Sequence, residues 1–305
     1  MTLTESVAKN IIQKLIKGQD YRIEIVTLIN TEFLQYAIDF FKKVVDAKLR
    51  SQDITVDWYK QEFLNPNLPA QEIAIHSGLN KKTIHNMFNS STREIIIDAS
   101  NENYDTLFEA IKNLVDTRHD LELTLTIKFK GVSVDLNISE SLIVINTLAV
   151  KRAELRGSLW STAGKRVEKP LMLTLCKLFG VNDINYAIRF RGKSKKKPEF
   201  EREIDFYLIG DESRNYKCEV KLMGRGNPES ADAVIARDSK VFVADKLSDT
   251  NKKQLDSLGI EWVELRSENG FKRFADVLKH LNIPYQDFNN DIDSKLSEIF
   301  KEIFK

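Results

Sequence analysis

The chain has 305 residues, of which 42% are hydrophobic and 30% are charged, and its formal net charge is +1 at pH 7. This composition is typical of a globular protein with either two domains or one large one. It excludes a chain that attracts nucleic acid through a large overall positive charge, so any DNA contact must come from local clusters of basic residues.

Signals for secretion or membrane insertion are not expected. The first ten residues lack the apolar stretch of a signal peptide, and no run approaches the length of a membrane span. The two cysteines, Cys176 and Cys218, give neither a disulfide framework nor the spacing of a metal site. We therefore expect a cytoplasmic protein with reduced cysteines and no membrane association.

The N-terminal residues predict scaffold elements. Residues 4–17 carry a helical stripe of apolar side chains that ends at Gly18. Residues 21–29 alternate in polarity and predict a strand, whereas residues 31–50 predict a long amphipathic helix. We expect these elements to support the fold rather than to form a site.

Residues 69–89 resemble a helix-turn-helix. Ala74 would let two helices cross closely, and Gly78 would supply the tight turn between them. Apolar residues on the second helix, Ile84 with Met87 or Phe88, would seat it on the first.

The second of these helices would expose donors suited to phosphates and base edges. These residues are Asn80, Lys81, Lys82, His85 and Asn86. The alternative is an ordinary helical hairpin that packs within a core.

The next segments complete a predicted N-terminal domain. Residues 93–99 predict a short buried strand and residues 104–115 a helix. Residues 121–129 and 132–138 alternate strictly around Lys130-Gly131 and predict a hairpin, either a wing beside the helix-turn-helix or the edge of an α+β domain. We predict a DNA-recognition domain over residues 1–138 and a second domain over residues 139–305.

The second predicted domain opens with helices. Residues 139–156 predict a helical link, and residues 167–178 predict a helix that begins near Glu168 and tolerates Pro170 in its first turn. A basic run follows that includes Lys195, Lys196 and Lys197. Such a run is either a solvated loop or, beside a catalytic site, a track for DNA phosphates.

Residues 203–221 predict an antiparallel hairpin around a polar turn at residues 210–215. Strand alternation places Asp205 on one face of the first strand, and it places Glu219 and Lys221 together on one face of the second. If these faces coincide, two carboxylates and an ammonium meet on an otherwise apolar sheet. Burying so much charge is costly unless the groups are paired or hold a metal.

This group of side chains suits hydrolysis of a phosphodiester. Carboxylate oxygens suit Mg²⁺, which keeps several waters and takes one or two protein carboxylates. The metal would lower the pKa of a bound water and neutralise charge on the phosphate. A neighbouring lysine would orient or deprotonate that water. The alternative is a solvated hairpin with a surface ion pair.

The pattern of Asp205, a hairpin turn and Glu219-Val220-Lys221 resembles the signature of the PD-(D/E)XK nucleases. Residues 156–240, including Gly224-Arg225-Gly226-Asn227-Pro228, resemble more narrowly the type II restriction endonucleases of the CfrBI group. This resemblance implies that Asp205 and Glu219 hold Mg²⁺ and that Lys221 acts on the water. It also implies that Glu168 completes the site, although an acid favoured at a helix N-terminus is the alternative.

The remaining segments fit the core of that superfamily. Arg225 and Asn227 lie in a predicted loop where the chain could approach a DNA groove. Residues 241–244 and 260–265 predict strands, residues 249–258 predict a helix between them, and residues 271–281 and 292–304 predict C-terminal helices. The expected fold is α/β (α+β), with a mixed sheet flanked by helices and an N-terminal domain before it.

We therefore expect a Mg²⁺-dependent restriction endonuclease that cuts double-stranded DNA at a specific sequence. A palindromic target favours a homodimer with two-fold symmetry. Two other functions stay open at this point. One is a nuclease that recognises branched or damaged DNA by shape, and the other is a helix-turn-helix regulator without catalysis.

Overall fold

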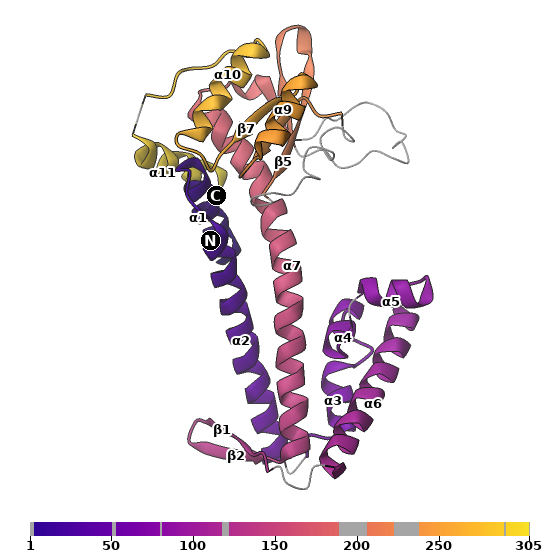
Figure 1. The fold of residues 1–305 in the computed structure, drawn as a ribbon. Helices are drawn as coiled ribbons and strands as arrows, with labels where there is room; N and C mark the ends of the chain where they lie inside the picture. Colours follow the sequence, from indigo (N-terminus) through magenta and orange to yellow (C-terminus); the bar gives the residue numbers. More distant parts are fainter. Residues whose placement is uncertain are drawn as a thin grey trace. The chain divides into compact units, whose positions relative to one another are not determined.

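The computed structural model describes residues 3–50, 53–79, 81–117, 122–188, 206–222, 238–289 and 291–304. Two compact units divide the chain: residues 1–28 with 160–305 form one, and residues 29–159 form the other. The described residues contain ten α-helices, a five-stranded mixed sheet and a two-stranded sheet (Figure 1). The fold is therefore α+β, as predicted. The functional division expected at residue 138 is a separate matter and stays a prediction.

The unit of residues 29–159 is mainly helical. Its helices are most of α2 (Arg22–Leu49), α3 (Val56–Phe63), α4 (Ala70–His76), α5 (Lys81–Phe88), α6 (Arg93–Thr117) and the first part of α7 (Ile138–Leu178). An aromatic core joins them, in which the rings of Tyr59 and Tyr104 stack with centroids 4.5 Å apart. The predicted hairpin is confirmed as β1 (Leu125–Phe129) and β2 (Val132–Leu136), whose turn residues Lys130 and Gly131 both have positive φ.

Two predicted strands are wrong because they are parts of helices. Residues 22–29 of the strand predicted over residues 21–29 form the start of α2, where Ile25, Leu28 and Ile29 are buried at helical spacing while Ile23 is 57% exposed. Residues 93–99 open α6, and the buried side chains there are Ile96 and Ala99, three residues apart. In both segments, β-branched residues gave a local appearance of a strand that helical packing overrides.

The two helices predicted over residues 139–156 and 167–178 are parts of a single helix, α7. α7 runs without interruption from Ile138 to Leu178, so Pro170 lies inside the helix and not in its first turn. The C-terminal part of α7 buries Val167, Leu171 and Leu175 completely. This apolar stripe fixes the helix against the core of its unit.

The other unit is built on a sheet in the order β3-β4-β5-β6-β7. Its strands are β3 (Tyr186–Ala187), β4 (Phe206–Ile209), β5 (Asn215–Lys221), β6 (Val241–Ala244) and β7 (Glu261–Glu264). β3, β4 and β5 pair antiparallel, whereas β5, β6 and β7 pair parallel. The predicted hairpin of residues 203–221 is thus confirmed for its described part, and the strands and helix expected between residues 241 and 265 are confirmed too.

Helices flank this sheet. α9 (Asp249–Ser257) connects β6 to β7, and its Leu255 packs against Phe242 and Ala244 of β6. The remaining helices of the unit are α1 (Leu3–Ile16), α10 (Arg273–His280) and α11 (Ile292–Ile303). Among the residues that the structure describes, no helix combines the length and the apolar character that a membrane span requires.

Glu140 ties together three parts of the helical unit, so its loss is expected to destabilise that unit. Its carboxylate accepts hydrogen bonds from the backbone N–H groups of Asn137 and Ile54 and lies 2.6 Å from Lys48 Nζ. Glu140→Ala should lower the free energy of unfolding by roughly 2–4 kcal/mol, because it leaves Lys48 without its buried partner. Urea unfolding followed by circular dichroism measures the change.

Asp53→Ala is the matched control, because Asp53 pairs with the same Lys48 at 3.5 Å but its side chain is 79% exposed. Its loss should cost less than about 0.5 kcal/mol. Equal effects of the two variants would contradict the role assigned to Glu140.

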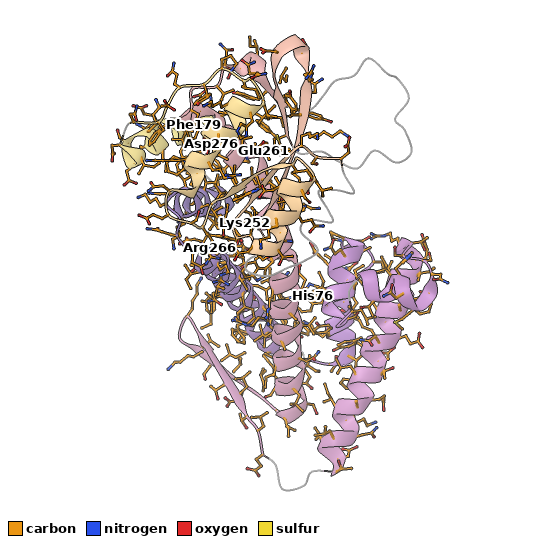
Figure 2. All side chains as sticks on the ribbon, turned by 45° about the horizontal axis from the view of Figure 1, so that its top comes forward. His76, Phe179, Lys252, Glu261, Arg266 and Asp276 are labelled. Carbon is orange, nitrogen blue, oxygen red and sulfur yellow. The ribbon has the colours of Figure 1, made fainter. Side chains whose placement is uncertain are left out.

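His76, at the end of α4, should make the helical unit sensitive to acid (Figure 2). Burial, together with the positive charges of Lys151 and Lys43, lowers the pKa of His76 to about 4. The unfolded chain, with a histidine pKa of about 6.5, therefore binds this proton more readily than the folded chain. The free energy of unfolding should be highest above pH 6.5, where His76 is neutral in both states, and should fall by about 3 kcal/mol as the pH drops to 4.

Unfolding measured across this pH range checks the expectation. His76→Gln should flatten the acid limb of the profile, whereas His280→Gln, which removes an exposed histidine, should leave it as in the wild type. An unchanged acid limb in His76→Gln would show that another group causes the loss.

Candidate active site

Glu219 and Lys221 meet on the middle strand of the sheet. They are two residues apart on β5, so their side chains point to the same face. Lys221 Nζ lies 2.7 Å from Glu219 Oε1, and the side chain of Glu219 is only 1% exposed while that of Lys221 is 23% exposed. A buried carboxylate is therefore paired with an ammonium that still reaches solvent.

Strand register identifies the face that carries this pair. Glu219 is the Cα partner of Phe242, and Lys221 is the Cα partner of Ala244. Partners on neighbouring strands point to the same side of a sheet, and Phe242 packs with Leu255 of α9. The pair thus lies on the face that α9 covers, while the fully buried Val220 points to the opposite face.

Of the two other predicted catalytic residues, the structure describes Glu168 but not Asp205. Asp205 lies outside the described residues, but it directly precedes Phe206, whose Cα partner is Cys218, the neighbour of Glu219. Glu168 is 8% exposed and lies deep within α7, far from the start of that helix at Ile138. Its burial is therefore not explained by the dipole of a helix N-terminus, which acts only over the first turn.

The described residues supply only part of the ligand set expected for a divalent metal. The described part of the chain contains no group of three or more His, Cys, Asp or Glu side chains that could hold a metal ion. Of the two expected ligands, Glu219 is described and Asp205 is not. Glu219 supplies a buried carboxylate oxygen, which is the donor type that Mg²⁺ takes from proteins.

Two further acids, which were not among the predicted site residues, lie at the same edge of the sheet. Asp245 follows β6, and Glu264 ends β7. Both are almost completely buried, with exposed fractions of 0% and 4%. The carboxyl ends of parallel strands meet at one edge and commonly carry functional groups, so the position of Asp245 directly after the strand predicted over residues 241–244 was a signal available in the sequence. Glu264 lies inside the strand predicted over residues 260–265 and carried no such signal.

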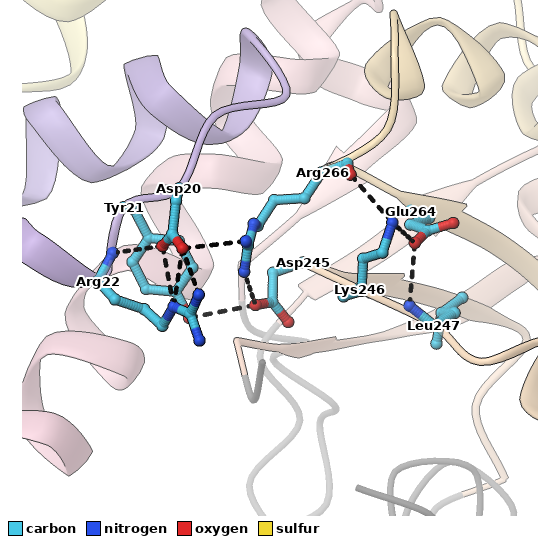
Figure 3. Close-up of polar contacts among 8 residues, drawn as sticks. All are labelled: Asp20, Tyr21, Arg22, Asp245, Lys246, Leu247, Glu264 and Arg266. Atoms are coloured by element: carbon cyan, nitrogen blue, oxygen red, sulfur yellow. Dashed lines mark hydrogen bonds and ion pairs between the residues drawn. The ribbon is translucent and has the colours of Figure 1, made fainter. Parts of the chain in front are cut away.

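Asp245 belongs to a network that reaches the start of α2 (Figure 3). It accepts a hydrogen bond from the Tyr21 hydroxyl at 3.5 Å and lies 3.7 Å from Arg266 Nη1. Arg266 in turn contacts Asp20 at 3.1 Å. A hydrogen bond from Arg22 holds the pKa of Asp20 well below its usual range, and burial raises the pKa of Tyr21.

Glu264 is the centre of a second cluster (Figure 3). Its two oxygens lie 3.0 Å from Lys246 Nζ and 2.6 Å from Lys252 Nζ, and the backbone N–H of Leu247 donates to it at 3.3 Å. Burial alone would raise the pKa of Glu264, but the hydrogen bonds from Lys252 and Lys246 outweigh it and the pKa is lowered. This carboxylate therefore stays ionised between two lysines.

The predicted helix-turn-helix region belongs to the other unit. α4 and α5 are joined by a turn in which Gly78 has φ +90°, and fully buried Ala74 and Ile84 pack together with part of α6. The expectation that Met87 or Phe88 seats the second helix is wrong, because these side chains are 61% and 45% exposed. Ile84 is the residue that holds α5.

Its predicted DNA-contacting residues are partly described. His85 and Asn86 are exposed on α5, and Lys81 and Lys82 open that helix, although their side chains lie outside the described part of the chain. Asn80 is outside the described residues. So are the predicted phosphate and groove contacts in the second domain, which are Lys195, Lys196, Lys197, Arg225 and Asn227.

Comparison with known proteins identifies the family. A model of the family described as CfrBI restriction endonuclease matches residues 5–252, which include Glu168, Asp205, Glu219 and Lys221. Neither the curated proteins nor the solved structures contain a match to this chain. Because the family match covers most of the sequence and includes the charged pair on β5, the chain belongs to the CfrBI restriction endonuclease family.

Proposed function

We propose that this restriction endonuclease depends on Mg²⁺ and makes double-strand cuts at a specific DNA sequence. The observation that carries the proposal is the pair of Glu219 and Lys221 on one face of β5, within the residues that the family model matches. A solvated hairpin with a surface ion pair would not bury its carboxylate to 1% exposure. The buried carboxylate and the partly exposed ammonium are instead suited to binding a metal ion and a phosphate.

The proposed roles follow from the chemistry of each group. Asp205 and Glu219 would hold the metal, with Glu168 as an auxiliary acid. When bound, Mg²⁺ supplies a water of lowered pKa and neutralises charge on the phosphate. Lys221 would turn at least partly from Glu219 towards the attacking water. There it would either orient the water, by donating a hydrogen bond as an ammonium, or accept its proton as a neutral amine.

Other parts of the proposal concern where and on what the enzyme acts. A palindromic site would be cut by a homodimer, because two-fold symmetry in the DNA is matched by two-fold symmetry in the protein. The bases would be contacted from α5, with Asn80, His85 and Asn86 as readers. Cys176 and Cys218 are buried free thiols, in keeping with a reducing compartment such as the cytoplasm.

Lys221→Ala should separate catalysis from binding. Cleavage should fall by about 10² to 10⁴, the usual contribution of a positioned proton-transfer group. Affinity for cognate DNA in Ca²⁺ should stay within about tenfold of the wild type, because the lysine acts mainly in the transition state. Lys221→Arg should not restore cleavage, since a guanidinium stays protonated. Single-turnover cleavage in Mg²⁺ beside a binding titration in Ca²⁺ measures both effects.

Lys217→Ala is the matched control. Lys217 lies on the same strand and the same face, but it is displaced by four residues and pairs with Asp238 at 3.8 Å. It should cut like the wild type. Glu219→Gln should abolish cleavage, and full activity in either Glu219→Gln or Lys221→Ala would overturn the site assignment. Binding without any metal-dependent cleavage by the wild type would favour a regulator, and cutting of branched substrates alone would favour a shape-specific nuclease.

DNA reading from α5 is tested with point variants. Lys81→Ala or Lys82→Ala should weaken binding to all sequences and reduce the slope of log Kd against log salt by about one for each phosphate that the variant no longer neutralises. Lys112→Ala, which removes an exposed lysine of α6, is the control. Deleting residues 1–138 is a poor test, because residues 1–28 belong to the unit that carries β5. Unchanged slopes in both variants would exclude α5 as a DNA contact.

A further inference from the structure

We propose that Lys246 and Lys252 form a second binding site for the DNA backbone beside the active site, held in place by the buried carboxylate of Glu264. The ligand is a phosphodiester of the strand that is cut, displaced from the phosphate that reacts. The inference rests on the proposed nuclease function and adds to it the point at which the sheet holds its substrate.

The position of the cluster follows from strand register. Ala244 of β6 has two Cα partners, Lys221 on β5 and Glu264 on β7. The three residues therefore lie in one row across the sheet and point to the same face. Strands are about 4.8 Å apart, so Glu264 lies about 10 Å from Lys221 along this row. Successive phosphates of one DNA strand are about 3.4 Å apart along the helix axis, so the distance between Lys221 and Glu264 corresponds to a few nucleotides.

Charge distinguishes this cluster from an ordinary structural ion pair. Glu264 faces two ammonium groups, so this cluster carries one positive charge in excess. Neither lysine forms an ion pair with another carboxylate among the described residues. The second cation is accounted for if an anion binds here and completes the balance.

Exposure shows which groups can reach a ligand. The Glu264 side chain is 5% exposed, while those of Lys246 and Lys252 are 36% and 27% exposed. The carboxylate is thus covered, and the ammonium groups lie between it and solvent. Lys246 Nζ also donates to the carbonyl of Arg266 at 3.3 Å, so its stem is fixed from two directions.

The fixed lysines are suited to a phosphate. An ammonium has three N–H donors, and Lys252 uses one on Glu264 and rests 5.4 Å from the centre of the Trp262 ring. Donors therefore remain for phosphate oxygens. Because the side chains are already ordered by Glu264 and Trp262, binding would cost less side-chain entropy than it does for free surface lysines.

The test measures how DNA binding depends on salt. Lys246→Gln and Lys252→Gln keep a donor near Glu264 but remove the charge. In Ca²⁺, with a DNA duplex that contains the cleaved sequence, each variant should bind about 3- to 10-fold more weakly and reduce the salt slope by about 0.9. In Mg²⁺, cleavage at saturating DNA should change less than about threefold, because the loss falls on KM and not on kcat.

Lys253→Gln is the matched control, since Lys253 neighbours Lys252 on α9 and is exposed. Its slope should equal that of the wild type. A purely structural role of the cluster would lower the melting temperature of the Lys246 and Lys252 variants and leave both slopes unchanged, and that result would overturn the inference. Failure of the wild type to cut any DNA in Mg²⁺ would overturn the proposed function instead, while the slopes in Ca²⁺, measured then on a mixed-sequence duplex, would still decide whether this site binds DNA.

Discussion

The pairing of buried carboxylates with cations at the edge of the parallel strands is the constraint on which the unit of residues 1–28 and 160–305 depends. β5, β6 and β7 each end in or next to such a pair: Glu219 with Lys221, Asp245 with Arg266, and Glu264 with Lys252. A buried carboxylate without a partner would cost several kcal/mol. Each acid therefore fixes the direction of its cation, and the cations fix the edge of the sheet at which a polyanion could be bound.

These three pairs do different work in the unit. The network around Asp245 reaches Asp20 and Tyr21, so it fastens the start of α2 to the sheet. The cluster around Glu264 joins the loop after β6 to α9. The pair on β5 is the one in which catalysis is proposed. The acids that hold the scaffold and the acid of the proposed site are thus stabilised in the same way, by pairing with a cation. This pairing explains how charged residues are tolerated in the interior of a small sheet.

The sequence predicted well where the pattern was local and two-sided. Alternation and turn residues correctly predicted three features: the hairpin at Lys130-Gly131, the face shared by Glu219 and Lys221, and the order of strand, helix and strand after residue 241. Residues 21–29 and 93–99 were misassigned, because a run rich in isoleucine satisfies both periods over a few residues and only packing partners distinguish them.

The limits of prediction at the site are of another kind. Asp245 and Glu264 sit among many charged residues, and nothing in their local pattern shows that they become buried. Their burial arises because parallel strands far apart in sequence end at one edge. The same long-range effect produces the continuous α7, since Pro170 would end a helix in isolation but here lies between turns that are buried against the core.

The division of the chain into units has a consequence for engineering. Residues 29–159 are inserted into the unit formed by residues 1–28 and 160–305, and both junctions fall inside helices, α2 and α7. Exchange of the inserted unit between relatives would therefore need two splice points in helical phase. Adding or deleting a single residue at either splice would rotate everything beyond it by about 100° and shift it by about 1.5 Å. A chimaera that exchanges the inserted unit is thus constrained by the helical pitch of α2 and α7 at the two splice points.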